Sequence, residues 1–415
     1  MKKNGSISEL ISKGKYTLFM ALIEKGVYFL VFVYFARTTD VKEYGIFVAV
    51  FAFANILNSF FEFGFGSYFQ RETASKQISI NEEFNVALGF RIIAFTVYII
   101  FTFFYYFYTN IPISSVVVLI SCIIYLTGFS SLLSQILYGL NRYEDSFISL
   151  TKSRIIIPIG ILILFLFSLS SYYILLFLFI AIFVQTYFLY LSVKKNGITV
   201  APIFRSSVLR IVLQSSLPMG IGVSFVWIYD KIDVLLIQQL INAESVSYYS
   251  VAYSIYKIPQ MISGVLLTPL FTDLSQRYSL YGKLYIDELL KPFSMLLGLS
   301  LVAIALFNIF PDTLLSLIYG NKYKESGIML GLLSFALPGL FFNNFTGVML
   351  NSIRQERKAM LSALFAMMVN ILINIFFLKQ IGIIAAVIAT ISAEYLILII
   401  QCYYLSKSKR IEWKI

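Results

Sequence analysis

Long apolar stretches separated by short polar segments make up most of this chain of 415 residues. Twelve of these stretches approach the roughly 20 apolar residues that a helix needs to cross a bilayer. The pattern therefore predicts an all-α polytopic membrane protein with about 12 transmembrane helices. The expected spans are Tyr16–Ala36, Ile46–Phe65, Phe84–Tyr108, Ile113–Tyr138, Ile155–Leu169, Tyr172–Val193, Ile211–Ile241, Ser247–Phe271, Pro292–Phe310, Ile328–Leu350, Met360–Leu378 and Ile383–Leu405.

Composition supports this prediction and narrows the chemistry. The chain is 59% hydrophobic and only 13% charged, whereas soluble domains carry about 25% charged residues. Histidine is absent, and the two cysteines, Cys122 and Cys402, form no CxxC pair. These facts exclude histidine-based acid–base catalysis and the common zinc motifs. We therefore expect no bound metal or cofactor, and a transporter is favoured over an enzyme.

The formal net charge of +11 reflects the expected topology. Most of the 32 lysines and arginines lie at the two chain ends and in alternate loops. The positive-inside rule then places both termini in the cytoplasm, including the polar segment Met1–Lys15. Nucleic acid is not needed to explain the basic excess.

Two halves of six spans each are expected, residues 1–200 and residues 201–415. The segment Arg37–Ala54 can be laid over Ile241–Ile258, because in both a span ends, an acidic turn follows and a tyrosine-led helix begins. Halves of equal orientation form a parallel repeat about an axis along the membrane normal.

Charged residues interrupt several of the expected spans. A charge in hydrocarbon costs at least ~2.5–3.5 kcal/mol, so such residues usually face a cavity or a partner. The densest group lies between Gln214 and Leu274. The charged residues within spans are Glu24, Lys25, Glu62, Arg91, Asp230, Lys231, Asp233, Lys257 and Glu394; solvated or packing roles are expected for Glu62 and Glu394.

The same region carries a family resemblance. Pro218, the segment IYDKIDVLLI and the segment SVSYYSVAYSIYKIP resemble the seventh and eighth spans of Wzx-type flippases for O-antigen or capsule repeat units. The opening ARTTDVKEYG and the ending VNILINIFFLKQIGIIAAVIATISAEY are similar to other parts of the same family. These flippases belong to the multidrug/oligosaccharidyl-lipid/polysaccharide exporter superfamily.

The resemblance implies a function and a setting. It implies two six-helix halves around a central cavity, which move undecaprenyl-pyrophosphate-linked oligosaccharide from the inner to the outer leaflet by alternating access. The setting would be the bacterial plasma (inner) membrane, where the protein is expected to be a monomer. Its expected partners are the lipid bilayer, a polysaccharide polymerase and a chain-length regulator.

Candidate site residues follow from the charges and polar helix faces. Lys25, Lys257, Arg91 and Lys231 are candidates for binding the pyrophosphate, and Glu24, Asp230 and Asp233 for coupling to H⁺ or Na⁺. Tyr253 and Tyr256 can stack on sugars, and Asn55 and Asn58 form a polar stripe. A purely structural interpretation stays open: Lys25 pairs with Glu24, Lys257 pairs with Asp230 or Asp233, the two aspartates hold Lys231, Arg91 snorkels, and the tyrosines form interfacial belts.

Two other functions compete with the flippase. A cation-coupled multidrug exporter of the same superfamily is the first, although the cationic residues Lys25 and Lys257 favour an anionic cargo. A polysaccharide polymerase or ligase is the second. Such enzymes need a large outward loop with arginines or histidine, and the longest outward loop expected here is only Pro311–Gly327.

Overall fold

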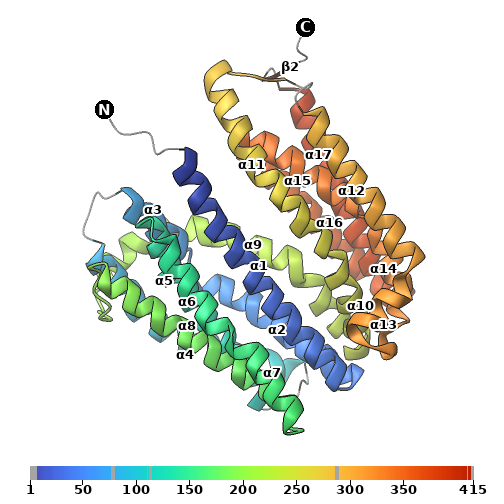
Figure 1. Cartoon of the computed structure of the whole chain (residues 1–415), viewed down its shortest axis with the longest axis horizontal. Helices are drawn as coiled ribbons and strands as arrows, with labels where there is room; N and C mark the ends of the chain where they lie inside the picture. Colours follow the sequence, from blue (N-terminus) through green and yellow to red (C-terminus); the bar gives the residue numbers. More distant parts are fainter. Residues whose placement is uncertain are drawn as a thin grey trace. The chain divides into compact units, whose positions relative to one another are not determined.

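The computed structural model describes residues 7–75, 80–109, 111, 115–285, 289–408 and 410–412. The chain divides into two compact units: unit 1 comprises residues 1–40 and 49–231, and unit 2 comprises residues 41–48 and 232–415. The helices that begin in unit 1 are α1 (Ile7–Thr38), α3 (Phe65–Ser75), α4 (Asn81–Tyr108), α5 (Ser115–Gly139), α6 (Tyr143–Arg154), α7 (Ile156–Leu166), α8 (Tyr173–Lys195) and α9 (Ser206–Leu240) (Figure 1).

Unit 2 contains the remaining elements. Helix α2 (Val41–Phe61) begins in unit 2 and continues into unit 1, whereas α9 continues from unit 1 into unit 2. The others are α10 (Ala243–Tyr256), α11 (Ile258–Tyr281), β1 (Leu284–Tyr285), α12 (Leu290–Ile309), α13 (Pro311–Tyr319), the 3₁₀ helix η2 (Asn321–Tyr323), α14 (Ser326–Ser334), α15 (Leu337–Ser352), α16 (Glu356–Ile381), α17 (Ile384–Ser406) and β2 (Ile411–Glu412).

The expected helical, polytopic fold is confirmed. Among the described residues, 10 segments are long and apolar enough to cross a membrane, and the pair α14–α15, bent by 42°, makes an eleventh. The expected eighth span, Ser247–Phe271, is not among these segments; it corresponds to α10 and α11, which are separated at Lys257. Pro259 stands at the start of α11, and proline is favoured in the first turn of a helix because its missing N–H has no intrahelical partner there.

One expected span is placed differently in the structure. The fifth was expected at Ile155–Leu169, but α6 and α7 together form the segment Tyr143–Leu166. The polar residues of α6 had suggested a loop. They form a helix because its polar face is buried: Ser146, Ser149, Ser153 and Arg154 are all inaccessible to solvent.

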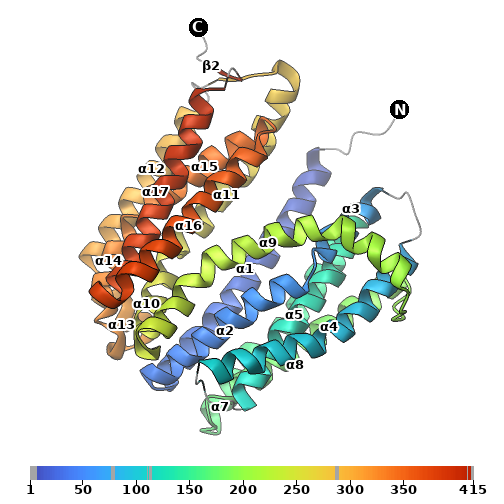
Figure 2. The ribbon, with the colours of Figure 1, turned by 180° about the vertical axis from the view of Figure 1, so that it is seen from behind.

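The core of unit 1 lies where α3, α4, α5, α8 and α9 meet (Figure 2). It is built from aromatic and aliphatic side chains such as Phe69, Phe84 and Leu133. At its polar edge, the Tyr68 hydroxyl donates to Glu83 Oε2 at 2.8 Å. Burial and the neighbouring Glu83 carboxylate raise the pKa of Tyr68 well above its usual range.

The segment after α8 is hydrogen-bonded to α4 of unit 1. The Asn85 side chain accepts from the Ala201 amide at 2.8 Å and donates to Thr199 Oγ1 at 2.9 Å. The Asn85 carbonyl also accepts from the Ile203 amide. These bonds explain why unit 1 continues past residue 200 to Lys231. A functional division into residues 1–200 and 201–415 stays a prediction.

Close packing fixes the first part of α9. Gly64 has a φ of +71°, and a Cβ there would lie 2.3 Å from the Ser216 carbonyl oxygen. A Cβ at Gly220 would lie 2.6 Å from the Gly64 amide nitrogen. The helix runs on through Pro218 without a break. Gly220, two residues after this proline, therefore allows the close packing of α9 against Gly64.

Unit 2 centres on the hairpin of α16 and α17 and on α15, which packs against α17 (Figure 1). The first turns of α2 pack on α10 so closely that a Cβ at Gly45 would lie 1.7 Å from the Ala243 carbonyl oxygen. The Ser247 hydroxyl donates to the Val41 carbonyl. This contact explains why residues 41–48 belong to unit 2.

Candidate functional site

Unit 1 contains a buried arginine that the sequence analysis placed in a loop. Arg154 ends α6 and is only 2% exposed. Its Nη2 lies 3.8 Å from Glu24 Oε1, and its guanidinium carbon lies 5.8 Å from the centroid of the Tyr28 ring. Within the described part of the chain, its three nitrogens have no hydrogen-bond acceptor. A buried guanidinium with unfilled donors is suited to receive an anionic group.

A second buried arginine lies on α4. Arg91 is 2% exposed, its Nη1 donates to the Gly128 carbonyl at 3.1 Å, and its guanidinium lies 5.1 Å from the Tyr125 ring centroid. The Tyr125 hydroxyl donates in turn to the Arg91 carbonyl. Nε and Nη2 have no acceptor among the described residues. Arg91 therefore does not snorkel to the membrane surface, and it retains two free donors.

Gly128 marks the point where three polar side chains meet. A Cβ at this position would lie 2.7 Å from both Asn58 Nδ2 and Glu62 Oε1, and 3.0 Å from Arg91 Nη2. Asn58 Nδ2 also donates to Glu62 Oε1 at 3.0 Å. The absence of a side chain at residue 128 thus leaves the space in which a guanidinium from α4 and a carboxylate from the end of α2 approach each other.

The two arginine sites share helix α5. The Tyr28 ring lies beside Arg154, and its hydroxyl lies 3.4 Å from Thr127 Oγ1, next to Gly128. We call this set of residues the arginine cluster. It consists of Glu24 and Tyr28 on α1, Asn58 and Glu62 at the end of α2, Arg91 on α4, Tyr125, Thr127 and Gly128 on α5, and Arg154 on α6.

The sequence predicted this cluster only in part. Arg91, Asn58 and Glu24 were expected, and the partner of Glu24 proves to be Arg154. Lys25 is exposed, and Asn55 Nδ2 donates to the Phe51 carbonyl of its own helix at 2.7 Å. Arg154 was missed. The helical spacing of Ser146, Ser149 and Ser153 was the signal that could have identified its helix.

Unit 2 contains a buried carboxylate surrounded by neutral donors. Asp233 on α9 is 6% exposed. Its Oδ2 accepts from the Tyr249 hydroxyl at 2.8 Å and lies 3.3 Å from the Thr390 hydroxyl, while its Oδ1 accepts from Asn374 Nδ2 at 2.9 Å. Asn374 also donates to the Asn370 carbonyl at 3.0 Å. We call these five residues the aspartate cluster.

The aspartate cluster draws on α9, α10, α16 and α17. Asn370 and Asn374 are one turn apart on α16, and their contact with Asp233 was not predicted from the sequence. The oxygen of the Asn374 side chain has no donor among the described residues. The Asp233 carboxylate has further side-chain oxygens nearby and no cation among its hydrogen-bond partners. Such a group is suited to bind a proton or a small hard cation.

Lys257 lies among tyrosine rings at the break between α10 and α11. Its Nζ is 5.1 Å from the Tyr253 ring centroid and 5.9 Å from that of Tyr256. Tyr253 stacks on Tyr249 at 5.5 Å, which links Lys257 to the aspartate cluster through aromatic contacts. Tyr256 is fully buried, whereas Tyr253 is half-buried.

The neighbouring charges of α9 form a local ion pair. Lys231 Nζ lies 2.8 Å from Asp230 Oδ2, and both side chains are about one third exposed, at 28% and 33%. Lys231 thus pairs with Asp230, while Asp233 has the separate set of partners given above. In the described part of the chain, no group of three His, Cys, Asp or Glu side chains could hold a metal ion.

The sequence of this chain is similar to known membrane proteins. A model of the polysaccharide biosynthesis protein family matches residues 10–275. An uncharacterized membrane protein of Methanocaldococcus jannaschii is 22% identical, over 91% of this chain and 80% of its own length.

Three solved structures share the fold. The lipid II flippase MurJ in an inward closed conformation is 17% identical with a TM-score of 0.75, over 97% of this chain and 88% of its own. An inward-facing multidrug resistance MATE transporter of the MOP superfamily is 15% identical with a TM-score of 0.67, over 92% of this chain and 93% of its own. A MOP superfamily transporter from Pyrococcus furiosus, described as having a binding pocket of reverse polarity, is 13% identical with a TM-score of 0.59, over 96% and 95%.

The solved structures share the expected helical, multi-pass fold with this chain. The first two of these solved structures are described as a flippase and a multidrug transporter.

Proposed function

Because this chain belongs to the polysaccharide biosynthesis protein family, we propose that it is a flippase for undecaprenyl-pyrophosphate-linked oligosaccharide. The cargo would be an O-antigen or capsule repeat unit, moved from the inner to the outer leaflet of a bacterial plasma membrane by alternating access. Both termini would lie in the cytoplasm, as the distribution of lysine and arginine predicts.

The observation that carries this proposal is the arginine cluster. Arg91 and Arg154 are both 2% exposed, and both retain donors that no described residue fills. Guanidinium groups bind phosphate through paired N–H donors, and the interaction is stronger in a region of low dielectric. A pyrophosphate head group supplies the acceptors that these donors lack. Glu24 and Glu62 would hold the two arginines in place while the cargo is absent.

The exposure and pairing of the other candidate residues determine how well each could contact the cargo. Lys25 is exposed and Lys257 is half-buried, so either ammonium can meet a cargo without a change of fold. Tyr253 offers a half-buried ring to a sugar, whereas Tyr256 is fully buried and suits packing. Lys231 is paired with Asp230 and is the weakest of the cationic candidates.

Asp233 is the coupling residue that we favour among the three predicted. Glu24 already pairs with Arg154, and Asp230 pairs with Lys231, so their charge is neutralised by a side chain. Asp233 is buried among neutral donors and can bind a proton or Na⁺ in exchange for them. Energy from an ion gradient would then enter at the aspartate cluster.

A multidrug exporter is the second candidate, because the fold of this chain also matches a MATE transporter over nearly its whole length. A carrier of organic cations needs an anionic site, and Asp233 is the buried carboxylate that could supply it. The arginine cluster favours the flippase instead.

The decisive experiment reconstitutes the full chain in sealed vesicles that hold undecaprenyl-pyrophosphate-linked oligosaccharide on one side only. A lectin added outside measures how fast the sugar becomes exposed. Wild type is compared with Lys25→Ala, Lys257→Ala and Arg91→Gln, and with Arg71→Gln as a control, since Arg71 is an exposed arginine of α3 paired with Glu72.

The expected result is sugar exposure by wild type and the control, with a loss in at least one of the three variants. The flippase proposal fails if wild type moves no lipid. Export of an organic cation by the same vesicles against a Na⁺ or proton gradient would then establish the exporter.

A further inference from the structure

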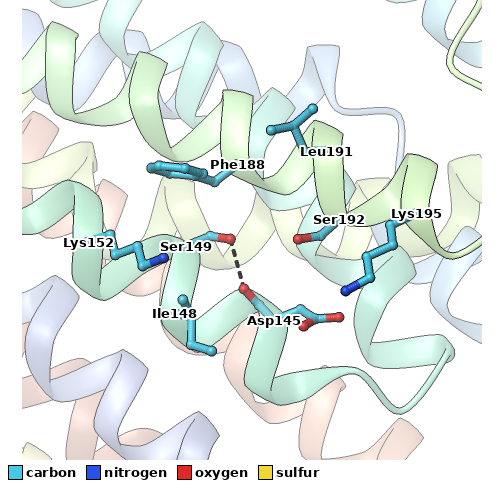
Figure 3. A pocket seen from close by; sticks show the side chains of 8 residues that line it. All are labelled: Asp145, Ile148, Ser149, Lys152, Phe188, Leu191, Ser192 and Lys195. Carbon is cyan, nitrogen blue, oxygen red and sulfur yellow. Dashed lines mark hydrogen bonds between the residues drawn. The ribbon is translucent and has the colours of Figure 1, made fainter.

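A groove lies between α6 and α8 on a different side of α6 from Arg154. Its volume is about 170 Å³. Lys152 is exposed, whereas Arg154, two residues further along the helix, is buried. Two residues correspond to about 200° around an α-helix, so the two cations serve opposite faces. The groove is lined by Asp145, Ile148, Ser149, Lys152, Phe188, Leu191, Ser192 and Lys195 (Figure 3).

Two ammonium groups stand at opposite ends of the groove (Figure 3). Lys152 Nζ lies 5.5 Å from the Phe188 ring centroid, a cation–π contact that holds it over α8. Lys195 stands at the other end, beside Asp145. The Ser149 hydroxyl donates to the Asp145 carbonyl at 2.7 Å, so it is already committed, while the Ser192 hydroxyl points into the groove. The lining is therefore net positive, with a hydroxyl between the charges.

The rim of the groove is apolar and faces outward. Ile148 and Leu191 are 39% and 41% exposed, and the exposed Phe183 and Tyr187 continue this surface along α8. Both helices belong to membrane-spanning segments, Tyr143–Leu166 and Tyr173–Lys195. An exposed cation on a lipid-facing surface is costly unless an anion or water meets it. The ligand that satisfies both the charges and the rim is an amphiphile with an anionic head.

One end of the groove lies among basic residues, at the end of the candidate membrane-spanning segment Tyr173–Lys195. Arg142 Nε donates to Asn196 Oδ1 at 3.1 Å, which ties the turn before α6 to the end of α8. Lys194 adds a further exposed cation next to Lys195. Basic pockets between membrane helices on the cytoplasmic side are suited to anionic lipid head groups.

We propose that the α6–α8 groove binds the phosphate of an anionic phospholipid of the surrounding bilayer. The phosphate lies between Lys152 and Lys195 and accepts from Ser192, and the acyl chains follow the apolar surface of Leu191 and Phe183. This site is separate from the arginine cluster and does not depend on the proposed cargo.

Native mass spectrometry of the full chain tests the site, with phosphatidylglycerol titrated against phosphatidylcholine. The variant Lys152→Gln/Lys195→Gln removes both ammonium groups. Lys379→Gln/Lys407→Gln is the matched control, because it removes the same charge from exposed positions that do not line the groove. Lys152→Arg/Lys195→Arg keeps the charge, and the melting temperature in phosphatidylcholine alone verifies folding.

We expect phosphatidylglycerol to bind about tenfold more weakly to the glutamine variant, and with wild-type affinity to the control and the arginine variant. Equal binding by the glutamine variant and wild type overturns the proposal. Inorganic phosphate at millimolar concentration should leave the lipid bound; if it displaces the lipid fully, the groove is a site for free phosphate. If the variant loses undecaprenyl pyrophosphate while it keeps phosphatidylglycerol, the groove belongs to the cargo pathway and the lipid site is refuted.

Discussion

The arginine cluster and the aspartate cluster are opposite in charge and in the way their partners are arranged. In unit 1, two arginines are the buried groups, and their carboxylate neighbours Glu24 and Glu62 are only partly buried. In the aspartate cluster of unit 2, the carboxylate of Asp233 is buried, and its hydrogen-bond partners are two hydroxyls and an amide. One cluster offers donors without acceptors, and the other offers an anion without a cation.

This difference separates two tasks that one transporter needs. Unfilled guanidinium donors suit a large anion that comes and goes, because each arginine keeps a neighbouring carboxylate when the anion is absent. A carboxylate held by neutral donors suits a proton or a small cation, because no fixed positive charge competes for it. We therefore expect variants of the aspartate cluster to change the dependence on the ion gradient, and variants of the arginine cluster to change the affinity for cargo.

The largest effect is expected from Asp233→Asn. The side chain keeps its size and can still bond to Tyr249 and Thr390, so the fold should persist while the negative charge is lost. We expect the transport rate in sealed vesicles to fall by about tenfold or more, with loss of its dependence on Na⁺ or pH.

A second substitution makes this test sharper. Asn374 donates to Asp233 at 2.9 Å, so Asp233→Asn/Asn374→Asp returns a carboxylate to the same cluster. Partial recovery of ion-dependent transport is expected. A normal rate in Asp233→Asn alone would refute the coupling role.

The next effect is expected from Arg154→Gln, which removes the buried cation of α6. The concentration of lipid-linked cargo needed for half-maximal transport should rise by about tenfold, while the ion dependence stays as in wild type. Arg154→Lys should recover only part of the affinity, because lysine lacks the planar pair of donors. Arg71→Gln serves as the surface control; an equal loss in that variant would contradict a specific role for Arg154.

A smaller effect than those on transport is expected from Gly128→Ala, which tests packing and changes the stability of the protein. An alanine Cβ would stand 2.7 Å from Asn58 and Glu62 atoms and 3.0 Å from Arg91. We expect Gly128→Ala to destabilise the protein by ~1–3 kcal/mol, seen as a lower melting temperature in detergent. Gly298→Ala on α12 is the matched control, since nothing lies within 4 Å of its Cβ position. It should be neutral or stabilising by up to ~1 kcal/mol, and an equal loss in both variants would contradict the packing argument.

Sequence patterns predicted the fold well because membrane spans are long, apolar and local. They misplaced the fifth span, since the buried face of α6 is built from serines and an arginine whose neighbours lie on other helices. For the same reason the charges within spans were found, but their partners were not. Arg154 pairs with Glu24 at a separation of 130 positions, and Asp233 meets Asn374 at 141. Such pairs depend on how the helices pack, which cannot be predicted from the pattern of a single sequence.

The smallest effect is expected at the pair of Asp230 and Lys231. Both side chains are about one third exposed and 2.8 Å apart, and ion pairs of this kind contribute ~0–1 kcal/mol. Asp230→Asn and Lys231→Gln should each change the transport rate less than about twofold, and a double-mutant cycle on the melting temperature should give a coupling free energy below ~1 kcal/mol. A tenfold loss in Asp230→Asn that the reversed pair Asp230→Lys/Lys231→Asp does not restore would mean that the ion also uses Asp230. The coupling site would then extend along α9 beyond the aspartate cluster, and the clear difference between the two clusters would no longer hold.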